Sequence, residues 1–149
     1  MLLTGSFPRA IDQKSRVAIP KRLREALGCD RGGILFIAPS TDNSLAVYTE
    51  DSFGRLAQRL AKASPTEQQV RAFTRLFYAR AQQVELDAQG RIRIPTELTA
   101  LAELQKEVVL LGVHDHLEIW SAQRWQQYLD ERQTHFDEIA EAAFGTPAD

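Results

Sequence analysis

A ten-residue pattern occurs twice in the chain and constrains its fold more than any other feature. It begins at Ile11 and again at Leu86, and the two copies read IDQKSRVAIP and LDAQGRIRIP. Each copy has an apolar residue, an Asp, three turn-tolerant residues, an Arg, an alternation of apolar and variable residues, and a Pro. This order predicts a turn, a short strand and the start of a helix. Because the pattern repeats, we expect two copies of one structural unit.

The similarity between the two halves continues beyond the pattern. Leu23 and Leu98 follow the two prolines at the same offset. Apolar runs then align with small changes in spacing, 34–37 with 108–111 and 45–48 with 117–120. Loops absorb insertions more easily than strands, which explains the changes in spacing. Each unit is therefore predicted to run strand, turn, strand, short helix, strand, strand and longer helix.

The doubled D-x-x-x-R motif, with a strand and Pro after each copy, and the closing Leu117-Glu118-Ile119-Trp120 resemble the MraZ family of bacterial transcriptional regulators. The resemblance covers roughly residues 5–128. It implies an α+β fold of two tandem SpoVT-AbrB-type swapped-hairpin units, with a barrel-like β core and peripheral helices. It also implies a ring-shaped homo-oligomer that binds repeated boxes upstream of the division and cell-wall gene cluster, where its own promoter lies.

The chain is predicted to have four parts. These are a first unit (5–53), a helical insert (54–80), a second unit (81–128), and a C-terminal helix and tail (129–149). A unit of about fifty residues is too small to bury its own apolar faces. We therefore expect the units to pair about a pseudo-two-fold axis and share one barrel-like sheet, which places the two turns side by side. The side chains expected to line this sheet are Val17, Ile19, Ile92 and Ile94.

Local signals predict the remaining elements. Residues 5–11 and 16–19 are expected to form a hairpin closed by the turn at 12–15. Gly90 holds the turn position that usually requires a left-handed residue, and Ser15 replaces it in the first copy, so the first turn is expected to be strained or differently shaped. Helices are predicted from Pro20 to Leu27, over 95–104, after Thr49 or Asp51, after the capping sequence at 64–67, and from near Ser121 to 145–147.

The net charge of −2 is low for a DNA-binding protein, but the charge is unevenly distributed. Residues 1–33 carry +4, residues 34–96 carry +2, and residues 97–149 carry −8. Lys and Arg on phosphates supply much of the affinity for a duplex. A basic N-terminal half can therefore meet DNA while the acidic C-terminal helix faces away.

Composition narrows the class of protein. Of 149 residues, 44% are apolar and 26% charged, as in ordinary globular domains. No stretch approaches the ~20 apolar residues of a membrane span, and the N-terminus lacks the features of a signal peptide. We therefore expect a cytoplasmic protein with no membrane partner, and the family resemblance implies that it is nucleoid-associated. A single cysteine, Cys29, excludes an internal disulfide and a cysteine-rich zinc site.

Arg16 and Arg91 are the leading candidates for contact with double-stranded DNA. The guanidinium fork fits phosphate oxygens and the O6/N7 edge of guanine with two donors. Asp12 and Asp87, with Gly90, are assigned to support the turns, because each carboxylate can accept backbone N–H bonds or pair with the Arg and aim it. Candidate phosphate ligands of lower rank are Lys14, Arg9, Lys21, Arg22, Arg24 and Arg93.

Structural interpretations compete with these assignments. An exposed Asp–Arg pair contributes only about 0–1 kcal/mol and is common on surfaces, and residues 21–24 are by default a solvated helix face. Residues 114–116 (His-Asp-His) are expected to form a hairpin tip rather than a metal site. The sequence has no glycine-rich phosphate loop or nucleophile signature. We therefore expect no catalytic residue, cofactor, metal or small-molecule substrate.

Two functions from different classes remain. The first is a sequence-specific DNA-binding transcriptional regulator that acts through the paired turns. The second is a protein-interaction scaffold or antitoxin-like partner module with the same fold, which would use the acidic tail and an apolar face on Trp125, Leu129 and Phe136. The two basic turns favour the regulator, and an enzyme is a distant third.

Overall fold

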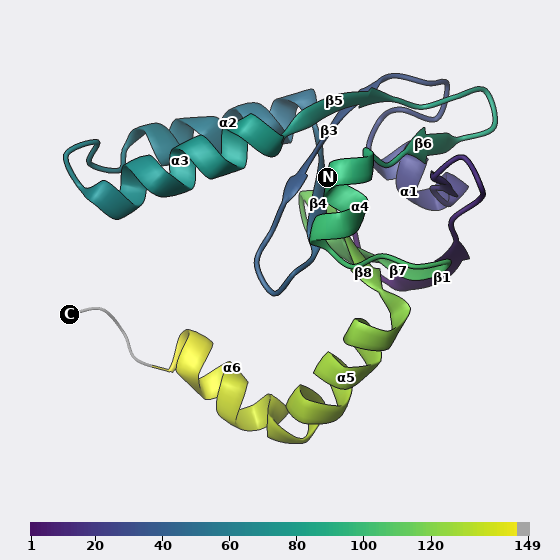
Figure 1. Cartoon of the computed structure of the whole chain (residues 1–149). Coiled ribbons are helices and arrows are strands. Elements are labelled where there is room, and N and C mark those ends of the chain that lie inside the picture. Colours follow the sequence, from purple (N-terminus) through teal and green to yellow (C-terminus); the bar gives the residue numbers. More distant parts are fainter. Residues whose placement is uncertain (146–149) are drawn as a thin grey trace.

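The computed structural model describes residues 1–145, and the order of its elements confirms the predicted repeat (Figure 1). In chain order they are β1 (Ser6–Ala10), β2 (Arg16–Ala18), α1 (Lys21–Ala26), β3 (Ile34–Pro39), β4 (Leu45–Thr49), α2 (Glu50–Ala61), α3 (Gln68–Arg80), β5 (Gln82–Glu85), β6 (Arg91–Arg93), α4 (Thr96–Leu101), β7 (Glu107–Val113), β8 (His116–Ser121), α5 (Ala122–Arg132), the 3-10 helix η1 (Gln133–His135) and α6 (Phe136–Phe144). Strand, turn, strand, short helix, two strands and a longer helix occur twice, with α3 between the two runs.

Strands of the two repeats interleave in one antiparallel sheet. Its six strands are ordered β1-β7-β8-β4-β3-β5. Thus β1 of the first repeat pairs with β7 of the second, and β5 of the second pairs with β3 of the first. The hairpins β3–β4 and β7–β8 meet at the centre through β4 and β8. Each repeat therefore supplies an edge strand to the other.

The strands β2 and β6 form a separate two-stranded antiparallel ribbon. The expected hairpin between residues 5–11 and 16–19 is therefore wrong, because the strands on either side of the turn pair with the other repeat. An alternating pattern defines which face of a strand is buried, but it does not define the strand's partner. The exchange is reciprocal: the backbone N–H of Ile19 donates to the carbonyl of Gly90 (2.9 Å), and that of Ile94 to Ser15 (2.8 Å).

A single apolar core joins the ribbon to the sheet. Val17, Ile19, Ile92 and Ile94 are at most 2% exposed, which confirms the predicted inner face. Buried side chains from α1, α4 and the central strands belong to the same cluster. The ribbon is thus held against the sheet by side chains from both repeats.

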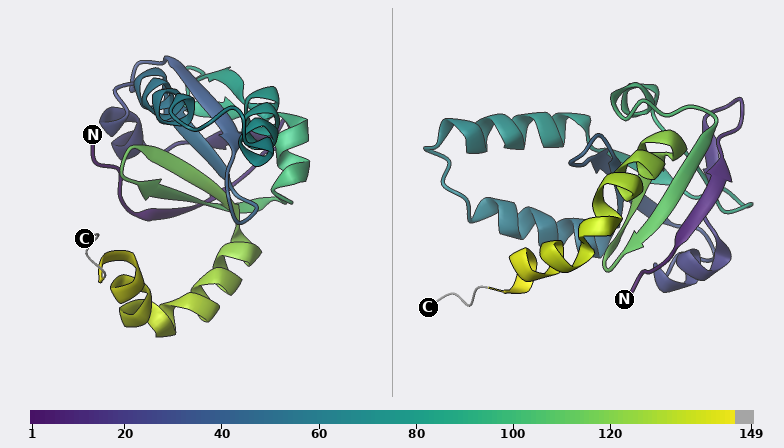
Figure 2. Two further views of the ribbon diagram at one scale, coloured as in Figure 1. Left: turned by 90° about the vertical axis from the view of Figure 1, so that its left-hand side faces the viewer. Right: turned by 90° about the horizontal axis from the view of Figure 1, so that it is seen from below.

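Two helical parts project from this core (Figures 1 and 2). The helices α2 and α3 lie side by side as a long hairpin, and α5, η1 and α6 form a bent arm that leaves the end of β8. The prediction of one continuous C-terminal helix is wrong at Gln133–His135, where a 3-10 turn separates α5 from α6. Thr134, which is β-branched, and His135 are both weak helix formers. Gly145 follows α6 as its C-cap, and the predicted end at 146–147 lies outside the described residues.

The helix boundaries differ from the predicted divisions of the chain. The limit at 53–54 falls inside α2, and the limit at 128–129 falls inside α5. Of the two predicted caps of α2, Thr49 and Asp51, it is Thr49 that caps the helix, through a reciprocal pair of bonds with Ser52. Over residues 1–145, no helix combines the length and the apolar character needed to cross a membrane.

Candidate nucleic-acid interface

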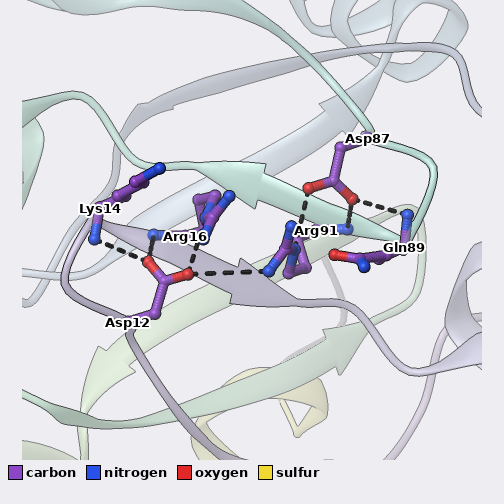
Figure 3. Close-up of polar contacts among 6 residues, drawn as sticks. All are labelled: Asp12, Lys14, Arg16, Asp87, Gln89 and Arg91. Atoms are coloured by element: carbon purple, nitrogen blue, oxygen red, sulfur yellow. Dashed lines mark hydrogen bonds and ion pairs between the residues drawn. The ribbon is translucent and has the colours of Figure 1, made fainter.

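The first turn closes around the carboxylate of Asp12 (Figure 3). Its Oδ1 accepts hydrogen bonds from the backbone N–H groups of Lys14 and Arg16, both at 2.9 Å. Its Oδ2 accepts from the Nε–H of Arg16 at 2.7 Å. The backbone N–H of Asp12 also donates to the carbonyl of Arg16 (2.9 Å). Asp12 therefore both shapes the turn and orients the arginine.

The second turn repeats this geometry. Oδ1 of Asp87 accepts from the backbone N–H groups of Gln89 and Arg91, and Oδ2 accepts from the Nε–H of Arg91, all at 2.9 Å. The fourth turn position has a positive φ in both copies, +76° at Gly90 and +62° at Ser15. The two turns therefore have the same shape, and the expected strain of the first lies at Ser15, because this region favours glycine.

The pairing of β2 with β6 brings the two turns together. Arg16 lies opposite Arg93, and Ala18 lies opposite Arg91. Because successive side chains alternate across a strand, these four share the outward face, while the residues between them face the core. Nη1 of Arg91 also lies 3.8 Å from Oδ2 of Asp12, which links the two turns directly (Figure 3).

We call the side chains of Lys14, Arg16, Arg91 and Arg93 the basic ribbon. Lys14 and Arg93 line a shared hollow of about 460 Å³. The Arg16 and Arg91 side chains are each 28% exposed. Since each aspartate engages Nε, donors on the Nη groups remain for a partner. A narrow strip with four cations has the chemistry to bind a phosphate backbone or the edge of a base.

The local bonds keep both turn carboxylates ionised at neutral pH. The pKa of Asp12 is lowered, most strongly by the hydrogen bond from the backbone N–H of Arg16. Burial opposes this shift, and the Arg16 guanidinium and the backbone N–H of Lys14 lower the pKa further. The pKa of Asp87 is lowered in the same way by Arg91. Each arginine is therefore held by charge as well as by hydrogen bonding.

Three of the other predicted cations lie away from the basic ribbon. Arg9 is on β1, at the edge of the six-stranded sheet. Lys21 is exposed at the start of α1, with its Nζ 3.9 Å from Oε1 of Glu25. The guanidinium of Arg22 lies over the ring of Phe7, 5.2 Å from its centroid. The structure does not gather these three side chains into one site with the turns.

The fourth, Arg24, packs against the backbone of the second turn. Its Nε–H donates to the carbonyl of Ile19 (2.9 Å), and a Cβ built on Gly90 would lie 2.6 Å from its Cζ. The corresponding residue of the second repeat is Thr99, whose buried hydroxyl has no hydrogen-bond partner among the described residues. Sequence reasoning placed Arg24 with Lys21 and missed this position, although the mismatch between Arg24 and Thr99 in the aligned repeats was an available signal.

The histidine segment and the cysteine do not form a second site. Residues 114–116 make the tip of the β7–β8 hairpin, as predicted, with Nδ1 of His116 2.9 Å from Oδ1 of Asp115. The described chain has no group of three or more residues that could hold a metal ion. Cys29 is buried, and burial raises the pKa of its thiol, which disfavours the reactive thiolate.

Comparison with known proteins agrees with the repeat and extends over nearly the whole chain. The family described as "MraZ protein, putative antitoxin-like" matches twice, over residues 2–76 and 77–146. The protein named Transcriptional regulator MraZ from Alkaliphilus metalliredigens is 42% identical over 139 residues, which cover 93% of this chain and 94% of the relative. Its namesake from Ligilactobacillus salivarius is 39% identical over 140 residues, 94% of this chain and 95% of the relative. This chain therefore belongs to the MraZ family.

Proposed function

We propose that this protein is a sequence-specific DNA-binding transcriptional regulator that contacts double-stranded DNA with the basic ribbon. The observation that carries the proposal is the register of β2 and β6, which sets Arg16, Arg91 and Arg93 on one outward face. A two-stranded β-ribbon fits the major groove of B-DNA, where arginine can bind guanine with two donors. The name shared by the curated relatives supports the same function.

Within this proposal the cations have different roles. Arg16 and Arg91 read base edges, each aimed by the aspartate of its own turn. Lys14 and Arg93 bind phosphates on either side of the hollow they share. Gly90 allows the second turn its left-handed conformation. Three basic residues outside the ribbon remain phosphate ligands of lower rank: Arg9, Lys21 and Arg22. Arg24 instead supports the second turn through its contacts with Ile19 and Gly90.

We further propose that the two repeats are SpoVT-AbrB-type units forming a swapped-hairpin barrel, and that several copies assemble into a ring. The pairings β1–β7, β3–β5 and β2–β6 support the exchange of strands between units. The net charge of −2 supports assembly, because one copy has no net positive charge and only one basic ribbon to hold DNA. The proposed targets are repeated boxes upstream of the division and cell-wall gene cluster, bound in the cytoplasm at the nucleoid without a cofactor, metal or small-molecule substrate.

A mobility-shift titration on the DNA upstream of the protein's own gene tests the proposal. The Arg16→Ala and Arg91→Ala variants should each bind more weakly by about 1–3 kcal/mol, the usual loss for one bidentate base contact. The double variant should be weaker still, with an unchanged circular dichroism spectrum. Arg132→Ala removes a positive charge from α5 and should bind like the wild type. Wild-type affinity in the folded double variant would show that the turns are structural.

A protein-interaction scaffold or antitoxin-like partner module is the second candidate. The exposed apolar side chains of α6 favour it, with Phe136 70% and Phe144 87% exposed. The description of the matching family as antitoxin-like agrees with it. In this alternative the turns contact protein, so substitution of Arg16 and Arg91 would leave binding to the upstream DNA unchanged and would abolish binding to a protein partner.

A further inference from the structure

The helix α6 has an apolar face that residues 1–145 leave uncovered. The apolar residues follow helical spacing, so they share one side of the helix: Phe136, Ile139, Ala140, Ala143 and Phe144. Figure 1 and the left view of Figure 2 show α6 standing clear of the sheet. A contiguous exposed apolar face of this kind marks an interaction surface.

The direction of the arm is fixed at its base. Ser121 caps α5 through its side chain. The ring of Trp120, on β8, lies 5.2 Å from that of Trp125 and 5.0 Å from that of Tyr128, centroid to centroid. Nη1 of Arg124 lies 3.1 Å from Oε2 of Glu103, beyond the end of α4. These contacts seat α5 against the sheet, and α6 extends away from the sheet (Figure 1).

The hairpin of α2 and α3 carries an apolar groove, a hollow into which a projecting helix could fit. A cavity of about 240 Å³ opens between the two helices and the β3–β4 hairpin. Its lining includes Leu56, Phe73, Leu76 and Phe77. Phe73 is 50% and Leu76 56% exposed, so the groove is apolar and open to solvent. Its size suits one aromatic side chain of a docked helix.

The charges of the two surfaces are complementary. Residues 50–80, which include both helices of the hairpin, have six basic and three acidic residues, a net charge of +3. The helix α6 has three acidic residues and no basic residue, Asp137, Glu138 and Glu141. A second copy of this chain therefore brings an acidic helix with an apolar face to an apolar groove on a helical hairpin of net positive charge, with Arg80 in the groove lining. Such complementarity steers association and selects the partner.

We propose that α6 of one copy docks into the α2–α3 groove of the next. The contact joins two different surfaces, so each copy still offers a free groove and a free α6, and such contacts generate closed rings or open filaments. The inference deepens the proposed assembly by naming the surfaces that join the copies. It does not depend on what the basic ribbon binds.

Two charged substitutions at exposed positions test the docking. Leu76→Asp disables the groove, and Phe136→Asp disables the arm. Each protein alone should have the mass of one chain, 16.8 kDa, by light scattering. An equal mixture should form a one-to-one complex, because one intact groove and one intact α6 remain. Leu2→Asp is the control. Leu2 is 77% exposed and belongs to neither of the two docking surfaces, so this variant should assemble like the wild type.

Charge reversal provides a second test that does not disturb the apolar contacts. Arg59→Glu/Arg80→Glu beside the groove and Glu138→Lys/Glu141→Lys in α6 should each raise the Kd of association by about tenfold or more. A mixture of the two reversed proteins should recover association, because the complementarity returns with opposite sign. The control Asp130→Lys/Glu131→Lys makes the same charge change on α5 and should have little effect.

Three results would overturn the docking. A wild type that stays a single chain at all concentrations would mean that α6 is free or covers its own groove. Full assembly of the Leu76→Asp protein would mean that α6 packs on α6. A mixture of the two disabled proteins that forms no complex would exclude the head-to-tail contact. Failure of DNA binding is distinguishable, because the single-chain variants keep Arg16 and Arg91 and can be tested on a duplex with one box.

Discussion

The aspartate of each turn divides its two carboxylate oxygens between two tasks. Oδ1 accepts the backbone N–H bonds that close the turn, and Oδ2 holds the Nε of the arginine. Asparagine in the same place keeps one acceptor oxygen for the backbone but loses the charge and the bond to the guanidinium. Asp12 has a further approach to Arg91 at 3.8 Å, so it acts on both arginines of the ribbon.

The lowered pKa values of Asp12 and Asp87 predict a dependence of stability on pH. A carboxyl with a lowered folded-state pKa binds fewer protons in the folded than in the unfolded chain. Its stabilisation is therefore complete above the ordinary value of 3.8 and is lost as pH falls through the folded-state value. Asp12→Asn and Asp87→Asn should each be less stable than the wild type at neutral pH and lose less stability on acidification.

Thermal unfolding followed by circular dichroism from neutral pH down to about pH 2.5 measures this difference. Glu131→Gln removes an exposed carboxylate of α5 and serves as the control. Asp12→Asn should also reduce DNA affinity more than Asp87→Asn, because it releases both arginines. If both variants lost as much thermal stability on acidification as the wild type, the turn carboxylates would not contribute to folding.

Arg24 is expected to support the second turn from behind rather than to bind phosphate. The salt dependence of DNA binding separates the two roles, because loss of one phosphate contact reduces the slope of log K against log salt by about 1. Arg24→Gln should weaken binding through disorder at Gly90 and leave the slope unchanged. Lys14→Gln, on the exposed ribbon, should reduce the slope. If the slope fell equally in Arg24→Gln and Lys14→Gln, Arg24 would be a phosphate ligand and not a support of the turn.

The two turns share their hydrogen bonds but differ in the residue at the left-handed position. Gly90→Ala should destabilise the protein by about 1–2 kcal/mol, the cost of a left-handed residue with a Cβ. Contact with Arg24, whose Cζ would lie 2.6 Å from the new Cβ, should add to that cost. Ser15→Gly should change the free energy of unfolding by less than about 1 kcal/mol, because relief of strain is offset by greater freedom of the unfolded chain.

Urea unfolding of Gly90→Ala, Arg24→Ala and the double variant measures the contact between the two residues. The double variant should be more stable than the sum of the single effects implies, because the truncated Arg24 no longer meets the added methyl group. Additive effects would show that Arg24 does not occupy the space beside Gly90.

Helix ends show how far local sequence rules reach in this chain. Thr49 and Asp51 were both candidates to cap α2. Thr49 is the cap, because its hydroxyl and that of Ser52 exchange bonds with each other's backbone N–H groups. Ser64 was expected to cap the next helix, but its hydroxyl bonds to Thr66 at 2.7 Å. The helix α3 therefore begins later, at Gln68. A side-chain bond within the loop competes with the cap, and the sequence pattern is the same in either case.

Across the whole molecule, the repeat was visible in the sequence because it is a local pattern copied once. The turns and their Asp–Arg pairs could be predicted for the same reason, since they lie within five residues. The pairing of β2 with β6 joins strands far apart in the chain and depends on how the two repeats bury their apolar faces together. The approach of Arg91 to Asp12 and the place of Arg93 beside Arg16 follow from that pairing, so no local rule could supply them.

The assembled molecule must compensate for a chain whose net charge is −2. One basic ribbon offers few phosphate contacts, but a ring would present the ribbon many times, and several boxes on one duplex could be engaged together. After the first contact, each further contact is intramolecular, and such linkage can raise avidity by about 10²–10⁴. We therefore expect a duplex with one box to bind about 10²-fold or more weakly than one with several boxes spaced by the helical repeat.

Titration of the two duplexes by fluorescence anisotropy, with the mass of the protein measured by light scattering in the same buffer, tests this mechanism. Salt should weaken binding to both duplexes, because phosphate contacts are lost in each. The Leu76→Asp variant keeps the basic ribbon but should lose the advantage of the multi-box duplex. Equal affinity of the wild type for both duplexes would contradict avidity, as would a single-chain protein that binds one box as tightly as the assembly binds several. Either result would require the four cations of one ribbon to supply the affinity by themselves.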